Sequence, residues 1–496
     1  MTGFSRRGAC PALSAPMQTG DGLLVRLNPV AGGVSPNALI GLCESASHYG
    51  NGIMEVTARG SLQIRGLTAE SASLLAAEVD ALGIAVRTGV PVETGPLAGL
   101  DPEEIADPRP LAERIRQAIE AAGLEGKLGP KVSVVVDGGG RLSMDTVLAD
   151  VRLVAVRRGD STTWNLAIAG DAHAAMALSC LDEAAACDAA LTILAAIAEH
   201  GKEVRARDLK PEQLAELASK FGTQNSFAPP SVLPIISPSR GEIIASSTPH
   251  TSGDAGDWYR RRRELISPLA GEMSGRTEGG GVGHTPLRAT PLKIFNLMNG
   301  NALGIGLPFG SMPAEGLAAL AKAAASLGAS EIRFAQQRAL LVLGLSKTAC
   351  AELQSVAASL GFVTDPADPR TKIAACPGAP ACASGHIATR KIAEEIASEF
   401  KDFDPPFSLH ISGCAKGCAN PAEAAFTLVG GEKGAGLVVS GTAKGLPGAY
   451  TPGYEAARGF GRVAALLRDR RRPGEDAAAC LARLGTAKVT AVFQQG

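Results

Sequence analysis

Short apolar runs and one amphipathic segment alternate through residues 1–90. Leu39, Leu42 and Ala46 keep helical spacing behind Ser35-Pro36, which is typical of a helix start with proline in the first turn. The apolar runs on either side predict strands at 22–27, 52–56 and 62–67. The order strand, helix, strand, strand predicts half of a ferredoxin-like α+β unit.

The same order returns later in the chain. A helix start is predicted at Met312-Pro313, and strands are predicted at 303–308, 331–334 and 340–345. Aligning residues 66–67 with 344–345 places Leu39 on Leu317 and Leu42 on Leu320 at one constant offset. This shared register predicts a duplicated unit. Chance similarity between two amphipathic segments is the alternative.

The remaining periodic segments are helices at 110–122, 184–198, 386–400 and 455–468, and strands at 131–136, 151–156, 407–411, 426–429 and 437–440. The pattern divides the chain into five parts. We expect an N-terminal arm and first half-domain over 1–90, an α/β domain over 91–225, a linker over 226–286, a second half-domain over 287–362, and a last domain over 363–496.

The linker has no hydrophobic period and is rich in Pro, Ser, Gly and Arg. Such a composition cannot bury enough apolar surface to offset the entropy of ordering, so we expect a disordered connector. The basic run at 260–263 could be read as a nucleic-acid patch. We favour a solvated charge cluster inside a disordered insert.

Composition narrows the class of protein. A chain of 496 residues with 45% apolar residues exceeds what one core usually serves, so two or more domains are expected. Its 48 basic and 49 acidic residues balance, which predicts neither a nucleic-acid nor an anionic-membrane partner. The N-terminus has no secretion signal, and the chain has no apolar run of about eighteen residues. We therefore expect a cytoplasmic protein.

Four of the ten cysteines form two close pairs, Cys376 with Cys382 and Cys414 with Cys418. Sets made only of thiolates select zinc or an iron–sulfur cluster. Zinc knuckles usually use the tighter C-x2-C spacing, whereas C-x5-C and C-x3-C suit the separated corners of a cubane. We predict a [4Fe-4S] cluster, with zinc or unliganded thiols as alternatives. The other cysteines are expected to be small core residues.

The sequences A-C-P-G-A-P-A-C-A-S-G and H-I-S-G-C-A-K-G-C-A resemble the sulfite and nitrite reductase superfamily, and within it the precorrin-3B synthase branch. The segments at 6–11 and 17–23 are similar to the same branch, and the resemblance fails only in the middle of the chain. It implies an α+β fold of duplicated nitrite/sulfite reductase-like architecture. Two ferredoxin-like half-domains would accompany two α/β domains of the cluster and tetrapyrrole type.

The resemblance also implies a reaction. Members hydroxylate precorrin-3A at C20 with dioxygen and close a γ-lactone, in aerobic cobalamin (vitamin B12) biosynthesis. By analogy the four paired cysteines hold the cluster, with Cys418 nearest the substrate, and an oxygen-activating mononuclear non-haem iron accompanies it. His386 and His410 are near enough in sequence to approach such an iron, although a core or surface histidine is the favoured interpretation. No catalytic residue is assigned.

No nucleotide-binding glycine motif opens a strand-to-helix turn, so electrons are expected from NADH through a partner reductase or small carrier. A carboxylate-rich tetrapyrrole needs basic and polar partners. Arg59 and Gln63 stand in a T-x-R-x-x-x-Q motif similar to that of sulfite reductases, and Lys131 stands in an L-P-x-K-like motif. The candidate substrate-binding residues are Arg59, Gln63, Arg65, Lys131, Arg338 and Lys416. Exposed structural charges are the alternative.

A sirohaem-dependent sulfite or nitrite reductase is the rival enzyme. Those enzymes carry a second lysine where this chain has Ser133, and Asn-Gly where it has Lys416-Gly417. Fewer cations in the anion pocket would weaken the stabilisation that reduction of an oxyanion needs. The rival that is not an enzyme is an iron–sulfur electron carrier or a tetrapyrrole-binding protein. A duplicated cleft with basic residues counts against a simple carrier, which needs neither.

Overall fold

The computed structural model describes residues 11–30, 32–221, 290–399, 408–475 and 477–495, together with the short strand segments 236–237, 272–273 and 276–277. The chain divides into two compact units, one of residues 1–177, 181–209 and 290–496 and one of residues 178–180 and 210–289. The motif at 6–11, the basic run at 260–263 and most of the predicted linker lie outside the described residues.

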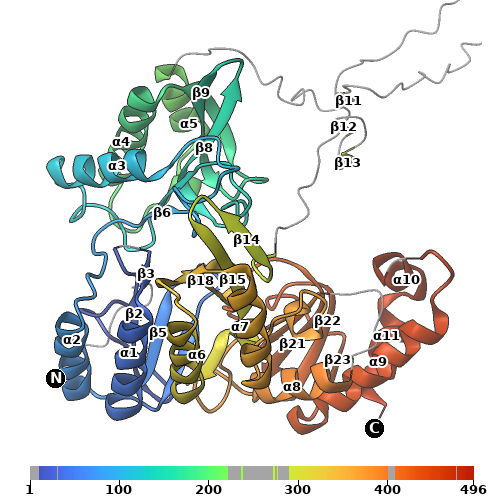
Figure 1. Ribbon diagram of the computed structural model, residues 1–496. Coiled ribbons are helices and arrows are strands. Elements are labelled where there is room, and N and C mark those ends of the chain that lie inside the picture. The colour runs from blue at the N-terminus through green and yellow to red at the C-terminus, as the bar shows by residue number, and fades with distance from the viewer. Residues whose placement is uncertain are drawn as a thin grey trace, which may run out of the picture. The chain divides into compact units, whose positions relative to one another are not determined.

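Two half-domains in the first unit repeat the same order of elements (Figure 1). The first consists of β1 (Met17–Thr19), β2 (Gly22–Leu27), β3 (Gly33–Val34), α1 (Pro36–Tyr49), β4 (Ile53–Val56), β5 (Leu62–Leu67) and α2 (Ala69–Ala81). The second consists of β14 (Ile294–Leu297), β15 (Gly300–Gly306), β16 (Ser311–Pro313), α6 (Ala314–Ser326), β17 (Glu331–Ala335), β18 (Ala339–Leu345) and α7 (Lys347–Ser359). The predicted duplication is confirmed.

The two half-domains exchange their short strands. Their sheets have the orders β1-β2-β5-β4-β16 and β14-β15-β18-β17-β3, so each takes an edge strand from the other copy. Met312 pairs with Met54 in the first sheet, and Val34 pairs with Ile332 in the second. Because each sheet ends on a strand from its partner, the copies depend on one another for their backbone hydrogen bonds.

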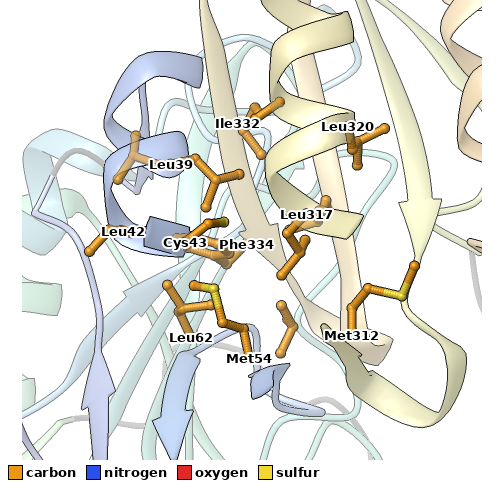
Figure 2. Close-up of a cluster of buried hydrophobic side chains, with 14 of the residues drawn as sticks. Leu39, Leu42, Cys43, Met54, Leu62, Met312, Leu317, Leu320, Ile332 and Phe334 are labelled. Atoms are coloured by element: carbon orange, nitrogen blue, oxygen red, sulfur yellow. The ribbon is translucent and has the colours of Figure 1, made fainter. Parts of the chain in front are cut away.

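One hydrophobic core serves both half-domains. The Ser35 hydroxyl accepts a hydrogen bond from the Ala38 N–H and caps the start of α1. Leu39 and Leu42 of α1 are buried in this core, and so are Leu317 and Leu320 of α6. Figure 2 shows these leucines gathered with side chains of both sheets, which are Met54, Leu62, Ile332 and Phe334.

The two α/β domains also share a strand order. One sheet contains β6 (Val92–Thr94), β7 (Val134–Asp137), β8 (Ala149–Arg158) and β9 (Ser161–Gly170); the other contains β19 (Ile373–Ala375), β20 (Leu409–Ser412), β21 (Ala424–Gly431), β22 (Gly434–Gly441) and β23 (Ala449–Thr451). In each, the first three of these strands pair in parallel and the fourth pairs antiparallel. β10 (Met176–Leu181) follows β9 in the chain.

The helices of these domains are α3 (Arg109–Ala121), α4 (Glu183–Glu199), α8 (Thr389–Glu399), α9 (Ala456–Arg470), α10 (Ala477–Leu484) and α11 (Thr486–Gln494). The predicted helix at 386–400 begins later, at Thr389, because His386 belongs to a loop in which its N–H donates to the Gly413 carbonyl (2.8 Å). The predicted strand at 131–136 likewise starts only at Val134.

The second unit contains α5 (Pro211–Lys220) and the two-residue strands β11 (Ile236–Ser237), β12 (Glu272–Met273) and β13 (Arg276–Thr277), which pair in that order. Among the described residues, every helix is too short or too polar to cross a membrane.

Candidate iron–sulfur site

The four paired cysteines lie on two loops at one edge of the second α/β sheet. Cys376 directly follows β19, and Cys414 follows β20, which pairs with β19 in parallel. Because parallel strands end at the same edge, the loops behind them meet there. The described part of the predicted strand at 407–411 is β20, which delivers Cys414 and Cys418 as expected.

The four thiols lie close enough to influence one another. Burial raises the pKa of Cys418, and neighbouring Cys376, Cys414 and Cys382 raise it further, while Lys416 opposes them. Within the described residues, no three His, Cys, Asp or Glu side chains converge closely enough to hold a single metal ion. Four thiols that lie near one another on two loops are a donor set that iron–sulfur clusters use.

The backbone around the thiols is drawn tightly together. The Gly413 N–H donates to the Cys376 sulfur (3.2 Å). A Cβ on Gly413 would lie 3.1 Å from the Gly378 Cα and 3.2 Å from the Gly385 Cα, so a larger residue would crowd the two loops where they approach. Amide donors to sulfur are a recurring feature of iron–sulfur sites. The donor set and its cradle therefore fit a [4Fe-4S] cluster.

Arg65 lies next to the first cysteine loop, with its side chain only 4% exposed. Its guanidinium bonds both carboxylate oxygens of Asp21 (2.9 and 3.0 Å), contacts Glu55 (3.4 Å) and donates to the Ala381 carbonyl (2.7 Å). Burial opposes the charged form, but Glu55 and Asp21 outweigh it and raise the pKa of Arg65. The buried Gln63, in the orientation that satisfies its amide, donates to Glu55 (3.1 Å).

Arg338 lies at the second cysteine loop. It sits in the turn between β17 and β18 with a left-handed φ of 62°, and it donates to the Ala419 carbonyl (2.6 Å). Burial and the charge of Arg390 lower the pKa of Arg338. His410 on β20 is fully buried, and neither of its ring nitrogens has a hydrogen-bond partner among the described residues. Burial and Arg338 lower the pKa of His410 to about 4, so the ring is neutral at physiological pH.

The other predicted residues divide between the two α/β domains. The Lys416 ammonium donates to the Ser384 hydroxyl (2.7 Å) and so links the two cysteine loops. Arg59 donates to the Leu148 carbonyl and lies 4.0 Å from Glu93, both in the first α/β domain. Lys131 is exposed in the loop before β7. The structure therefore brings Arg65, Arg338 and Lys416 to the cysteine loops, and it leaves Arg59 and Lys131 at the other domain.

Three residues of the site are not predicted by the sequence patterns: Asp21, Glu55 and Arg390. Asp21 orients Arg65, and Glu55 pairs with Arg65 and also with Arg390. Asp21 stands inside the family-like segment at 17–23, which is a signal that could have found it. Glu55 and Arg390 stand outside the matched motifs.

The corresponding loops of the first α/β domain hold an ion pair instead of cysteines. The loop after β6 carries Asp101 and the loop after β7 carries Arg141, and their side chains meet at 2.8 Å. The Asp101 carboxylate is buried, and Arg141 outweighs the burial and lowers its pKa. The two α/β domains thus share a strand order, but the loops carry an Asp101–Arg141 ion pair in the first domain and cysteine pairs in the second.

The fold and the cysteine site together define a protein of the nitrite and sulfite reductase class. A model of the nitrite/sulfite reductase ferredoxin-like half domain matches residues 15–82. The NirA protein of Mycobacterium tuberculosis has a similar structure, with a TM-score of 0.69 and 18% identity over 94% of this chain and 84% of that chain, which shows the shared fold.

Within this class the chain belongs to the precorrin-3B synthase family. It is 38% identical to a protein of Sinorhizobium named precorrin-3B synthase over 492 residues, 99% of this chain and 95% of that relative. It is also 22% identical to a ferredoxin–nitrite reductase of Synechococcus elongatus over 424 residues, 82% of this chain and 76% of that protein.

Proposed function

We propose that this protein is a precorrin-3B synthase, which hydroxylates precorrin-3A at C20 with dioxygen and closes a γ-lactone in aerobic cobalamin biosynthesis. The observation that carries the proposal is the similarity to a protein of that name over nearly the whole of both chains. Insertion of one oxygen atom requires two electrons and two protons, and the second oxygen atom leaves as water. We place the reaction in the cytoplasm.

The proposed cluster ligands are Cys376, Cys382, Cys414 and Cys418. A bound [4Fe-4S] cluster supplies electrons one at a time. The Gly413 N–H is placed to stabilise charge on the Cys376 sulfur. NADH is the proposed indirect electron source, through a partner reductase or small carrier. A mononuclear non-haem iron is a second proposed group, and we assign it no ligands.

The proposed substrate partners fall into two kinds. Arg59, Lys131 and Lys416 are exposed basic side chains, so these three can meet the carboxylates of the tetrapyrrole directly. Gln63 and Arg65 are buried and Arg338 is half-buried, and all three are engaged with protein groups. We propose that Arg65 and Arg338 act on the substrate through the cysteine loops that they contact, and that Gln63 supports Arg65 through Glu55.

The test is an absorption and EPR spectrum of anaerobically purified protein before and after dithionite, with extracted pigment analysed separately. The proposal predicts a reducible cluster and no stoichiometric sirohaem, because the tetrapyrrole is substrate and leaves with turnover. Stoichiometric sirohaem coupled to the cluster, with turnover of sulfite or nitrite, would replace the proposal by a reductase. A reducible cluster that never yields an oxygenated product would leave an electron carrier or tetrapyrrole-binding protein.

A further inference from the structure

The first cysteine loop is held at the residue before Cys382. The carbonyl of Ala381 accepts two hydrogen bonds, one from Arg65 (2.7 Å) and one from the Gly20 N–H (3.2 Å). A Cβ on Gly20 would lie 2.6 Å from the Ala383 nitrogen, so the chain of the first half-domain presses directly against this loop. Both donors come from the first half-domain.

The second cysteine loop is held at the residue after Cys418. The carbonyl of Ala419 accepts from Arg338 (2.6 Å), which belongs to the second half-domain. The backbone of Arg338 is fixed in turn, because its carbonyl accepts from the Leu307 N–H (3.0 Å). Each half-domain therefore supplies one arginine to one cysteine loop.

The first α/β domain repeats this arrangement without cysteines. Arg333 on β17 donates to the Pro96 carbonyl (3.1 Å) in the loop after β6, and Arg59 donates to the Leu148 carbonyl at the end of the loop after β7. Each α/β domain thus receives one arginine from a hairpin strand and one from a hairpin turn, each from a different half-domain. In the shared register of the two copies, Arg65 aligns with Leu343 and Arg333 aligns with Glu55, so the two α/β domains receive similar contacts from different positions.

We propose that Arg65 and Arg338 are positioning residues for the cluster, each fixing the two sulfur ligands of one loop through a backbone carbonyl. This inference rests on the proposed cluster. A guanidinium can serve several acceptors from one rigid fork, as Arg65 does for Asp21 and Ala381, whereas the single ammonium of lysine cannot reproduce that geometry.

The two clamps, Arg65 on the Ala381 carbonyl and Arg338 on the Ala419 carbonyl, differ in charge. Arg65 is neutralised by Asp21 and Glu55. Arg338 has no carboxylate partner in the part of the chain that the structure describes, and its charged neighbour is Arg390. Replacing Arg338 therefore removes an unpaired positive charge beside the cysteines. This removal destabilises the reduced cluster, which is more negative than the oxidised one. We expect its removal to lower the midpoint potential as well as to loosen the loop.

The test is hydrogen–deuterium exchange of the full-length chain carrying Arg65→Met, Arg338→Met or, as matched control, Arg333→Met. Arg65→Met is expected to speed exchange about tenfold in 376–386 and less in 413–420, and Arg338→Met to do the reverse. Arg333→Met is expected to change neither loop. Unchanged exchange in both cysteine loops, or equal changes in all three variants, would overturn the proposal.

Conservative variants cover the case in which a methionine variant does not fold. Asp21→Asn leaves the Arg65 guanidinium but removes the charge that orients it, so it is expected to speed exchange in 376–386 alone. Arg338→Lys keeps the charge but not the fork, so it is expected to loosen 413–420 while the midpoint potential of the cluster stays near that of the wild type. Wild-type exchange in both variants would contradict the clamps.

The outcomes separate this inference from the proposed function. Exchange of the two loops can be measured whether or not a cluster is present. If wild-type protein binds no cluster, the proposed function fails while the exchange pattern still tests the clamps. If the cluster forms and the exchange pattern is absent, only the positioning role fails.

Discussion

The four paired cysteines are the residues on which the account depends most. Replacing Cys414 with serine removes one thiolate ligand, so we expect iron content to fall well below about four per chain and the EPR signal of the reduced cluster to be lost or altered. Cys187→Ser is the matched control, because this half-buried cysteine lies on α4 in the other α/β domain. A Cys414→Ser protein with wild-type iron content and spectrum would exclude this residue as a ligand.

Glu104 gives a pH-dependent prediction. Burial and the nearby carboxylates of Asp107, Asp101 and Asp137 raise the pKa of Glu104 from 4.5 to about 7, although the Gly99 N–H opposes the shift. The folded state therefore binds this proton more tightly than the unfolded state. The stabilisation is present below about pH 4.5 and is lost as the pH rises through about 7.

Glu104→Gln keeps a neutral side chain at every pH. We expect it to match wild type near pH 5 and to be more stable at pH 8 by on the order of 1 kcal/mol, after allowance for solvent screening. Thermal melting at both pH values measures the difference, with exposed Glu120→Gln on α3 as control. Equal melting temperatures of Glu104→Gln and wild type at pH 8 would contradict the raised pKa.

The sequence predicts the cysteines better than the residues around them. The ligand pairs are close in sequence and their spacing carries the chemistry, so a local pattern finds them. Arg65 and the Ala381 carbonyl are separated by 316 residues, and no local pattern reports that contact. The positive charge of a side chain marks it as a candidate partner of the substrate, but charge does not distinguish a side chain that meets substrate from one that holds a loop.

At the scale of elements, the exchanged strands make the half-domains interdependent. β16 of the second copy completes the first sheet beside β4, and α6 shares the core with α1. A chain of residues 11–90 alone would expose both the edge of β4 and the apolar face of α1. We expect such a fragment to show no cooperative melting.

Co-expression of residues 11–90 with residues 290–366 should restore the shared core. The expected result is co-purification of the two fragments and a cooperative transition by circular dichroism. Leu317→Ala in the second fragment is the control, because a buried leucine truncated to alanine typically costs about 2–5 kcal/mol and should weaken the association. Independent cooperative folding of residues 11–90 would contradict the shared core.

Elements with a strong apolar period are predicted and weakly patterned ones are not. α1 and α6 present leucines at helical spacing, and both are recognised from their sequences. α2 and α7 each follow the last strand of their half-domain, but their many alanines and serines leave few large apolar residues at helical spacing. β6 has three residues, which is too short for any period. The exchange of β3 and β16 depends on tertiary pairing that no local pattern contains.

For the whole molecule, duplication has produced two α/β domains with the same strand order, and the second of them carries the cysteine pairs. The first α/β domain joins its two loops with Asp101 and Arg141, and the second has cysteine pairs on the corresponding loops. Arginines from both half-domains contact both pairs of loops. The order of elements and the duplication can be predicted from the sequence. The ion pair that takes the place of cysteines in the first α/β domain is seen only in the fold.

The central claim is an oxygen-dependent hydroxylation of a tetrapyrrole. The most direct test supplies precorrin-3A, an electron donor and 18O-labelled dioxygen to anaerobically purified protein and determines the mass of the product. The account predicts a hydroxylated γ-lactone that carries one labelled oxygen atom, and no product without dioxygen. Unchanged precorrin-3A under these conditions, from protein that holds an intact cluster, would contradict the account.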